Sequence, residues 1–130
     1  MKTSTNKLLM ILGSLNAGLA VLLGAFGAHA LKARLSAEML AVYQTGVQYH
    51  FYHALGLLIL GLASAQASKS RWLNLSAGFM LSGIILFSGS LYVLALTGTR
   101  AWGMVTPFGG LAFILAWVGF ALGTWRAGAH

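Results

Sequence analysis

Residues 8–28 form an apolar stretch without a charged side chain, and its length constrains the fold more than any other feature of the chain. An α-helix rises about 1.5 Å per residue, so about 20 such residues cross the roughly 30 Å hydrocarbon core of a bilayer. Three further uncharged segments follow at 45–66, 73–96 and 107–125. We therefore expect an all-α polytopic membrane protein, an antiparallel bundle of four transmembrane helices.

The composition agrees with a single membrane domain over residues 1–130. Only 7% of the residues are charged and 58% are hydrophobic, with a mean hydropathy of +0.82. Soluble domains carry about 25% charged residues. Four spans use nearly the whole length, so we expect no domain outside the membrane.

The first apolar segment has one competing interpretation, a cleaved signal peptide. Ala28-His29-Ala30 has the small-x-small form of a cleavage site. The apolar part of a signal peptide is about 7–15 residues long, however, and residues 8–28 exceed that length. We expect this segment to be retained as the first span.

Residues 30–44, between the first two spans, are expected to form an amphipathic segment at the membrane surface. Residues 31–35, Leu-Lys-Ala-Arg-Leu, are basic and amphipathic. Ser36 is placed to cap a helix that has Glu38 in its first turn. Whether residues 36–49 lie along the interface or enter the bilayer is left open by the sequence.

The formal charge of +7 comes from basic residues that are spread over the segment ends. This distribution is typical of topology signals and lipid-headgroup contacts, and it disfavours nucleic acid as a partner. In a four-span arrangement, one side carries Lys2, Lys7, Lys69, Arg71 and Arg126, and the other carries Lys32, Arg34 and Arg100. The positive-inside rule then predicts that both termini are cytoplasmic.

Small residues recur at helical spacing in three of the spans. Such residues let helix backbones approach closely in lipid. The predicted packing positions are Gly13, Asn16, Ala17, Ala20, Gly24 and Gly27 in the first span, Gly78, Ser82 and Gly89 in the third, and Gly109, Ala112, Ala116, Gly119 and Gly123 in the fourth. We expect Asn16, at the edge of the first stripe, to hydrogen-bond to a neighbouring helix.

Polar side chains concentrate in residues 43–53, which hold two of the four histidines and three of the four tyrosines. On a helix most of them, including Gln48 and His53, fall within about half of the circumference, whereas His50 falls on the other side, near Tyr43. A polar half-face is unfavourable against lipid. It is expected to face the bundle interior, a water-filled vestibule or the headgroup layer.

Four short motifs follow one another along the chain. They are Gly24-Ala25-Phe26-Gly27-Ala28-His29, then Gln44-Thr45-Gly46 with Tyr49 and His53, then Phe87-Ser88-Gly89-Ser90-Leu91-Tyr92, and Thr106-Pro107-Phe108-Gly109-Gly110. With these motifs, the chain resembles the YgdD-like bacterial inner-membrane proteins, a domain-of-unknown-function family with relatives in eukaryotes. The resemblance covers nearly the whole chain. It implies a small multi-span protein of the inner membrane and supplies neither an activity nor a site.

The function we expect is binding rather than catalysis, at the end of the bundle opposite the cytoplasm. A part aromatic, part hydroxyl pocket there would suit a lipid headgroup, a quinone-like or isoprenoid amphiphile, or the span of a partner protein or of a second copy. The predicted ligand-binding residues are His29, Gln44, Gln48, Tyr49, Tyr52, His53, Ser88, Ser90, Tyr92 and Arg100. The open alternative is that these groups only satisfy one another inside a structural bundle.

Two further function classes stay open. The first is an oligomeric channel or small-solute transporter lined by Asn16, Ser82 and the face around His53, although no carboxylate lies deep in a span. The second is a metal or haem site built on His50 and His53 with His29. We expect no resident cofactor and no enzyme, because Glu38 is the sole carboxylate side chain and the chain has no cysteine.

Overall fold

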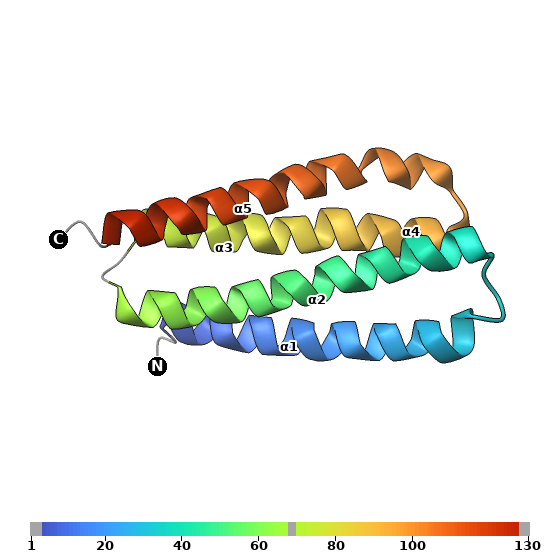
Figure 1. Cartoon of the computed structure of the whole chain (residues 1–130), viewed down its shortest axis with the longest axis horizontal. Helices are drawn as coiled ribbons and strands as arrows, with labels where there is room; N and C mark the ends of the chain where they lie inside the picture. The colour runs from blue at the N-terminus through green and yellow to red at the C-terminus, as the bar shows by residue number, and fades with distance from the viewer. Residues whose placement is uncertain (1–3, 68–69, 128–130) are drawn as a thin grey trace.

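The computed structural model describes residues 4–67 and 70–127, and this part of the chain contains only helices and short turns. Several neighbouring elements join end to end into longer helices, so that four long helical segments lie side by side (Figure 1). The elements are α1 (Thr5–Phe26), the π-helical turn η1 (Gly27–Leu31), α2 (Ala37–Gln66), α3 (Arg71–Gly83), the π-helical turn η2 (Ile84–Ser88), α4 (Gly89–Thr97), the 3-10 helix η3 (Arg100–Met104) and α5 (Thr106–Ala127).

Local side chains explain several helix ends. The Ser36 hydroxyl accepts a hydrogen bond from the Met39 amide over 3.1 Å and begins α2, as predicted, and Ser70 caps α3 in the same way. Gly98 ends α4 with a φ of 71°, a left-handed conformation that glycine adopts without strain. Pro107 lies in the first turn of α5, where its missing N–H leaves no hydrogen bond unmade.

The helices pack as two pairs, α1 against α2 and α3 against α5, and α2 joins the pairs by packing against α4. Glycines set the closest approaches. A Cβ added at Gly13 would lie 2.8 Å from the backbone nitrogen of Leu58, and one added at Gly109 would lie 2.2 Å from the backbone nitrogen of Phe87. Every position of the stripe predicted for the fourth span is buried on α5, namely Gly109, Ala112, Ala116, Gly119 and Gly123.

The structure corrects the stripe predicted for the third span. Gly78 has open space where a Cβ would stand, and the exposed Ser82 donates to the carbonyl of Gly78 in its own helix. The contact side of α3 instead carries Ser76 and Gly83. Small residues occur on both sides of this segment, and the π-helical turn η2 also shifts the register beyond it, so a wheel of 100° per residue misplaces Gly89.

The chain is an integral membrane protein. Three of its helical segments, Thr5–Leu31, Arg71–Thr97 and Arg100–Ala127, are long and apolar enough to cross a bilayer. Their outer surfaces carry large apolar side chains such as Ile85, which is 70% exposed. A water-facing surface would not be covered in this way.

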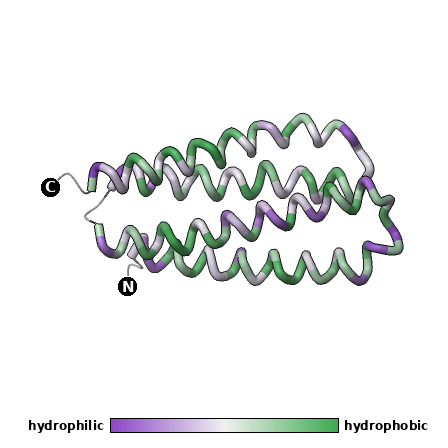
Figure 2. Tube along the Cα trace, viewed as in Figure 1, coloured by the Kyte–Doolittle hydropathy of each residue, from purple (hydrophilic) through white to green (hydrophobic). Residues whose placement is uncertain are grey.

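The second helical segment, α2, is as long as the others but more polar. Figure 2 shows hydrophilic positions spread through the half of α2 that begins at Ala37. α2 continues without a break from Ala37 to Gln66, so residues 30–44 do not form a separate helix. They are divided among the end of η1, a turn over 32–36 and the first two turns of α2.

The helix ends gather at the two ends of the bundle (Figure 1). The start of α1, the end of α2, the start of α3 and the end of α5 lie at one end, and the turns over 32–36 and 98–105 lie at the other. At the second end Arg100 and Glu38 form an ion pair of 3.4 Å, which is largely exposed and therefore weak. Lys2, Lys69 and His130 lie outside the described residues.

Candidate functional site

The polar side chains of α2 point in three directions rather than into one pocket. His50 points into the interior toward α1 and α4, His53 points toward α5, and Gln48 lies on the outer surface. Because α2 is packed on several sides, each direction meets a different neighbour.

His50 is buried and joins three helices. Its Nε2 lies 2.9 Å from Oδ1 of Asn16 on α1, and its Nδ1 lies 2.9 Å from the hydroxyl of Tyr92 on α4. A carbonyl oxygen only accepts, so Nε2 is the donor and Nδ1 of the neutral ring accepts from Tyr92. The Asn16 amide nitrogen donates to the carbonyl of Leu12, so each of these three polar side chains is hydrogen-bonded.

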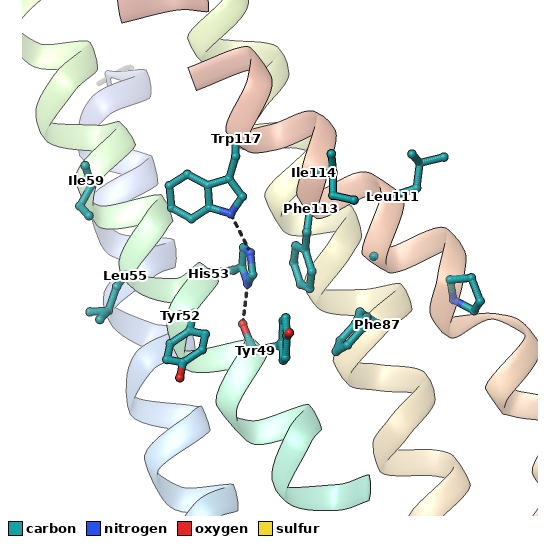
Figure 3. A pocket seen from close by; sticks show the side chains of 12 residues that line it. Tyr49, Tyr52, His53, Leu55, Ile59, Phe87, Leu111, Phe113, Ile114 and Trp117 are labelled. Carbon is teal, nitrogen blue, oxygen red and sulfur yellow. Dashed lines mark hydrogen bonds between the residues drawn. The ribbon is translucent and has the colours of Figure 1, made fainter. Parts of the chain in front are cut away.

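His53 is also enclosed, with 4% of its surface exposed, and it bridges α2 and α5 (Figure 3). Nδ1 donates to the carbonyl of Tyr49 over 2.7 Å, and Nε2 accepts from the indole N–H of Trp117 over 3.0 Å. The imidazole stacks on Phe113 with 3.5 Å between ring centroids and 9° between planes. These contacts fix the ring in one neutral tautomer and one orientation.

A groove of about 910 Å³ runs beside His53, between α2, η2 and α5. Figure 3 shows its aromatic wall, in which the ring centroids of Tyr49 and Phe87 lie 4.6 Å apart. The side chains of Tyr49 and Tyr52 are partly exposed and bring hydroxyls to an otherwise carbon surface. The residues lining the groove are Tyr49, Tyr52, His53, Leu55, Ile59, Phe87, Pro107, Gly110, Leu111, Phe113, Ile114 and Trp117.

Of the predicted ligand-binding residues, only Tyr49, Tyr52 and His53 line this groove. Two of the others are buried and bonded within the protein. Ser88 donates to the carbonyl of Gly46 over 2.7 Å, and Ser90 pairs with the hydroxyl of Thr106 over 2.6 Å.

The remaining predicted residues lie elsewhere. Tyr92 faces His50, away from the groove. His29, Gln44 and Arg100 are exposed, and Gln48 lies on the outer surface of α2. The structure thus corrects the expectation that all these side chains converge on one pocket.

Sequence reasoning missed two partners of the site, Trp117 and Phe113. Trp117 stands in the middle of the segment 107–125, whereas tryptophan in membrane proteins is enriched at the interfaces. That position was a usable signal for an indole N–H that bonds to a neighbouring helix. Phe113 carried no comparable signal, because phenylalanine is ordinary anywhere in a span.

The contacts of the two histidines disfavour a metal site, and the positions of the predicted lining residues disfavour a channel. Both ring nitrogens of His50 and of His53 are bonded to protein groups, and no three His, Cys, Asp or Glu side chains come together among residues 4–67 and 70–127. A metal would have to displace one of these hydrogen bonds. The predicted channel lining is likewise divided, since Asn16 bonds inward to His50 and Ser82 is exposed on α3.

Comparison with known proteins identifies a family and several relatives. Residues 23–110 match the family described as Protein of unknown function (DUF423). The UPF0382 membrane protein YwdK of Bacillus subtilis (strain 168) is 47% identical over 112 residues, which cover 86% of this chain and 91% of that protein. The UPF0382 inner membrane protein YgdD of Escherichia coli (strain K12) is 41% identical over 123 residues, with coverages of 94% and 92%. No solved structure matches.

Proposed function

The chain belongs to the DUF423 family, as its resemblance to the YgdD-like proteins predicted, and from that premise we propose a non-enzymatic four-span protein of the bacterial inner membrane that binds an amphiphile between α2 and α5. One observation carries the proposal. It is the groove of about 910 Å³, apolar and aromatic, beside an imidazole whose own hydrogen bonds are complete.

The neighbours of α2 support its role as the fourth span. Its 30 residues extend about 45 Å, more than the roughly 30 Å of a hydrocarbon core. It packs between α1 and α4, which belong to segments apolar enough to cross a membrane. The two histidines near mid-helix, His50 and His53, are turned inward and hydrogen-bonded, which suits a helix in a membrane.

The lining of the groove indicates the class of ligand. Its volume falls in the range of about 300–1,000 Å³ that small-molecule pockets occupy. Leucine, isoleucine and aromatic side chains suit a chain or flat ring of carbon, and the hydroxyls of Tyr49 and Tyr52 suit one oxygen function on that ligand. An isoprenoid or quinone-like molecule, or the glycerol region of a phospholipid, has this composition.

Filling the groove should abolish ligand retention without unfolding the protein. Gly110 lines the groove, and a Cβ added there would meet only the Phe87 ring, at 3.8 Å or more, so Gly110→Leu fits and projects into the space. We expect at least about a tenfold loss of bound amphiphile. The new leucine side chain would occupy the space of the ligand, and the aromatic side chains of the groove are too closely packed to move aside. Native mass spectrometry and solvent extraction of the purified protein measure it.

Gly78→Leu is the matched control, because it adds the same side chain to open surface on α3. It should retain the amphiphile of the unchanged protein. Equal retention in both variants, or the absence of any amphiphile from the unchanged protein, would contradict binding in this groove.

The orientation we propose has both termini in the cytoplasm, since the positive-inside rule follows the five basic residues on that side against three on the other. The chain has no cysteine, so single cysteines report sidedness cleanly. Ala33→Cys should react with an impermeant maleimide added to intact spheroplasts, and Gln66→Cys should react only after lysis. Labelling of both from the same side would show that α2 does not cross the membrane.

A further inference from the structure

The outer face of α2 carries polar side chains at a depth where a bilayer offers no hydrogen-bond partner. Gln44, Gln48 and Tyr52 follow one another at intervals of four residues, and all three are exposed. About 20 of the 30 residues of α2 cross the hydrocarbon core, and every such stretch includes residues 47–56. Given the proposed crossing of α2, Gln48 and Tyr52 therefore lie within the hydrocarbon.

Gln48 is only partly satisfied by its own chain. Within the described residues its side chain makes one hydrogen bond, in which Nε2 donates to the hydroxyl of Tyr52 over 2.6 Å. A primary amide has two N–H donors and a carbonyl oxygen with two lone pairs. One N–H and the oxygen are left for a partner outside the chain, and leaving them in hydrocarbon is strongly unfavourable.

The surface beside Gln48 forms a groove. A groove of about 540 Å³ runs between α1 and α2, along Ala20, Gly24, Ala25 and Ala28 on one side and Gln48 and Tyr52 on the other. Small side chains lower the surface of α1 so that another backbone can approach closely. This groove shares only Tyr52 with the one that faces α5.

We infer that this face binds a second copy of the chain, in a dimer whose two-fold axis is perpendicular to the membrane. Such an axis places Gln48 of the two copies at the same depth and opposite each other. The amide is self-complementary, so each copy supplies the donor and the acceptor that the other lacks. A helix of a different protein would need its own polar group at this depth. The inference rests on the crossing of α2, not on amphiphile binding.

Disulfide trapping tests the dimer, because the chain has no cysteine of its own. Val21→Cys places a thiol beside the groove, and Val118→Cys places the same side chain on the outer surface of α5; the two valines are 60% and 50% exposed. Both stand ten to twelve residues from the same end of the bundle. In native membranes treated with copper phenanthroline, we expect a covalent dimer from Val21→Cys and none from Val118→Cys.

A second change tests the amide itself. Gln48→Leu, added to Val21→Cys, removes both reciprocal hydrogen bonds of the pair and should weaken dimer association about tenfold or more, since one interhelical hydrogen bond in a bilayer is worth about three- to thirtyfold. Photobleaching step counts in liposomes of defined protein density measure it. Ser82→Ala, an exposed polar residue on α3, should change nothing.

Three outcomes would overturn the inference. They are equal cross-linking of Val21→Cys and Val118→Cys, a cross-link from Val21→Cys to another protein only, and unchanged association of Gln48→Leu. The sidedness of Ala33→Cys and Gln66→Cys shows separately whether α2 crosses. The amphiphile content of Gly110→Leu reports on the other groove, so failure of one proposal is distinguishable from failure of the other.

Discussion

Gly109→Ala should destabilise the protein by about 3 kcal/mol or more, the upper range for overpacking a well-packed interior. A Cβ at this position would lie 2.2 Å from the backbone nitrogen of Phe87 and 2.6 Å from its Cα. Backbone atoms within the π-helical turn η2 cannot rotate away as a side chain end would. The added methyl group must therefore push α5 away from η2, and the contact between Gly83 and Phe113 lies on the same interface.

Gly78→Ala provides the comparison, since a Cβ there meets nothing within 4 Å. Alanine is favoured over glycine in a helix by about 1 kcal/mol, so this variant should be neutral or slightly stabilised. Thermal unfolding of both variants in one detergent measures the difference. Similar melting temperatures for Gly109→Ala and Gly78→Ala would mean that α5 and η2 are not in close contact.

The contrast between these two glycines also shows how far sequence reasoning reaches. The apolar segments, the cap at Ser36 and the small face of α5 follow from composition and spacing, because each is a property of one helix. On α5 most of the small residues occupy one face, so the wheel identified it. On the third segment small residues occur on both sides, and the π-helical turn η2 breaks the periodicity on which the wheel depends.

The site was predictable only in part, for a related reason. Sequence spacing placed Tyr49, Tyr52 and His53 on one side of α2, and they do line one groove. Which residues face them depends on how α5 is rotated, and no single-helix pattern contains that information. His29 and Arg100 were grouped with them because they belong to the same end of the bundle, a criterion too coarse for a bundle four helices wide.

The two histidines of α2 are expected to have different roles, His50 in stability and His53 in ligand binding. His50 and His53 are offset by about 60° around α2. Because α2 has helices on several sides, this offset is enough for them to meet different partners, Asn16 and Tyr92 for His50 and Trp117 for His53. His50 touches α1 and α4 and lines neither groove, whereas His53 forms the wall beside Tyr49 and Phe113. Changes at His50 should therefore alter the free energy of unfolding and leave amphiphile retention by the folded protein unchanged.

His50→Ala should accordingly cost about 3–5 kcal/mol of stability, the range for removing one partner of a buried polar network together with its volume. The change leaves a cavity and removes the partner of both Asn16 Oδ1 and the Tyr92 hydroxyl. Reversible unfolding in mixed detergent measures the loss. His29→Ala, at an exposed histidine, should stay within about 0.5 kcal/mol of the unchanged protein.

A double-mutant cycle separates the hydrogen bond from the cavity. Tyr92→Phe removes only the hydroxyl, and once His50 is alanine that hydroxyl has already lost its partner. The second change should then be less damaging than it is alone, with a coupling of about 0.5–2 kcal/mol between His50 and Tyr92. Strict additivity would mean that the two side chains do not interact. Their hydrogen bond would then contribute nothing to holding α4 against α2, and the loss caused by His50→Ala would come from the cavity and from Asn16.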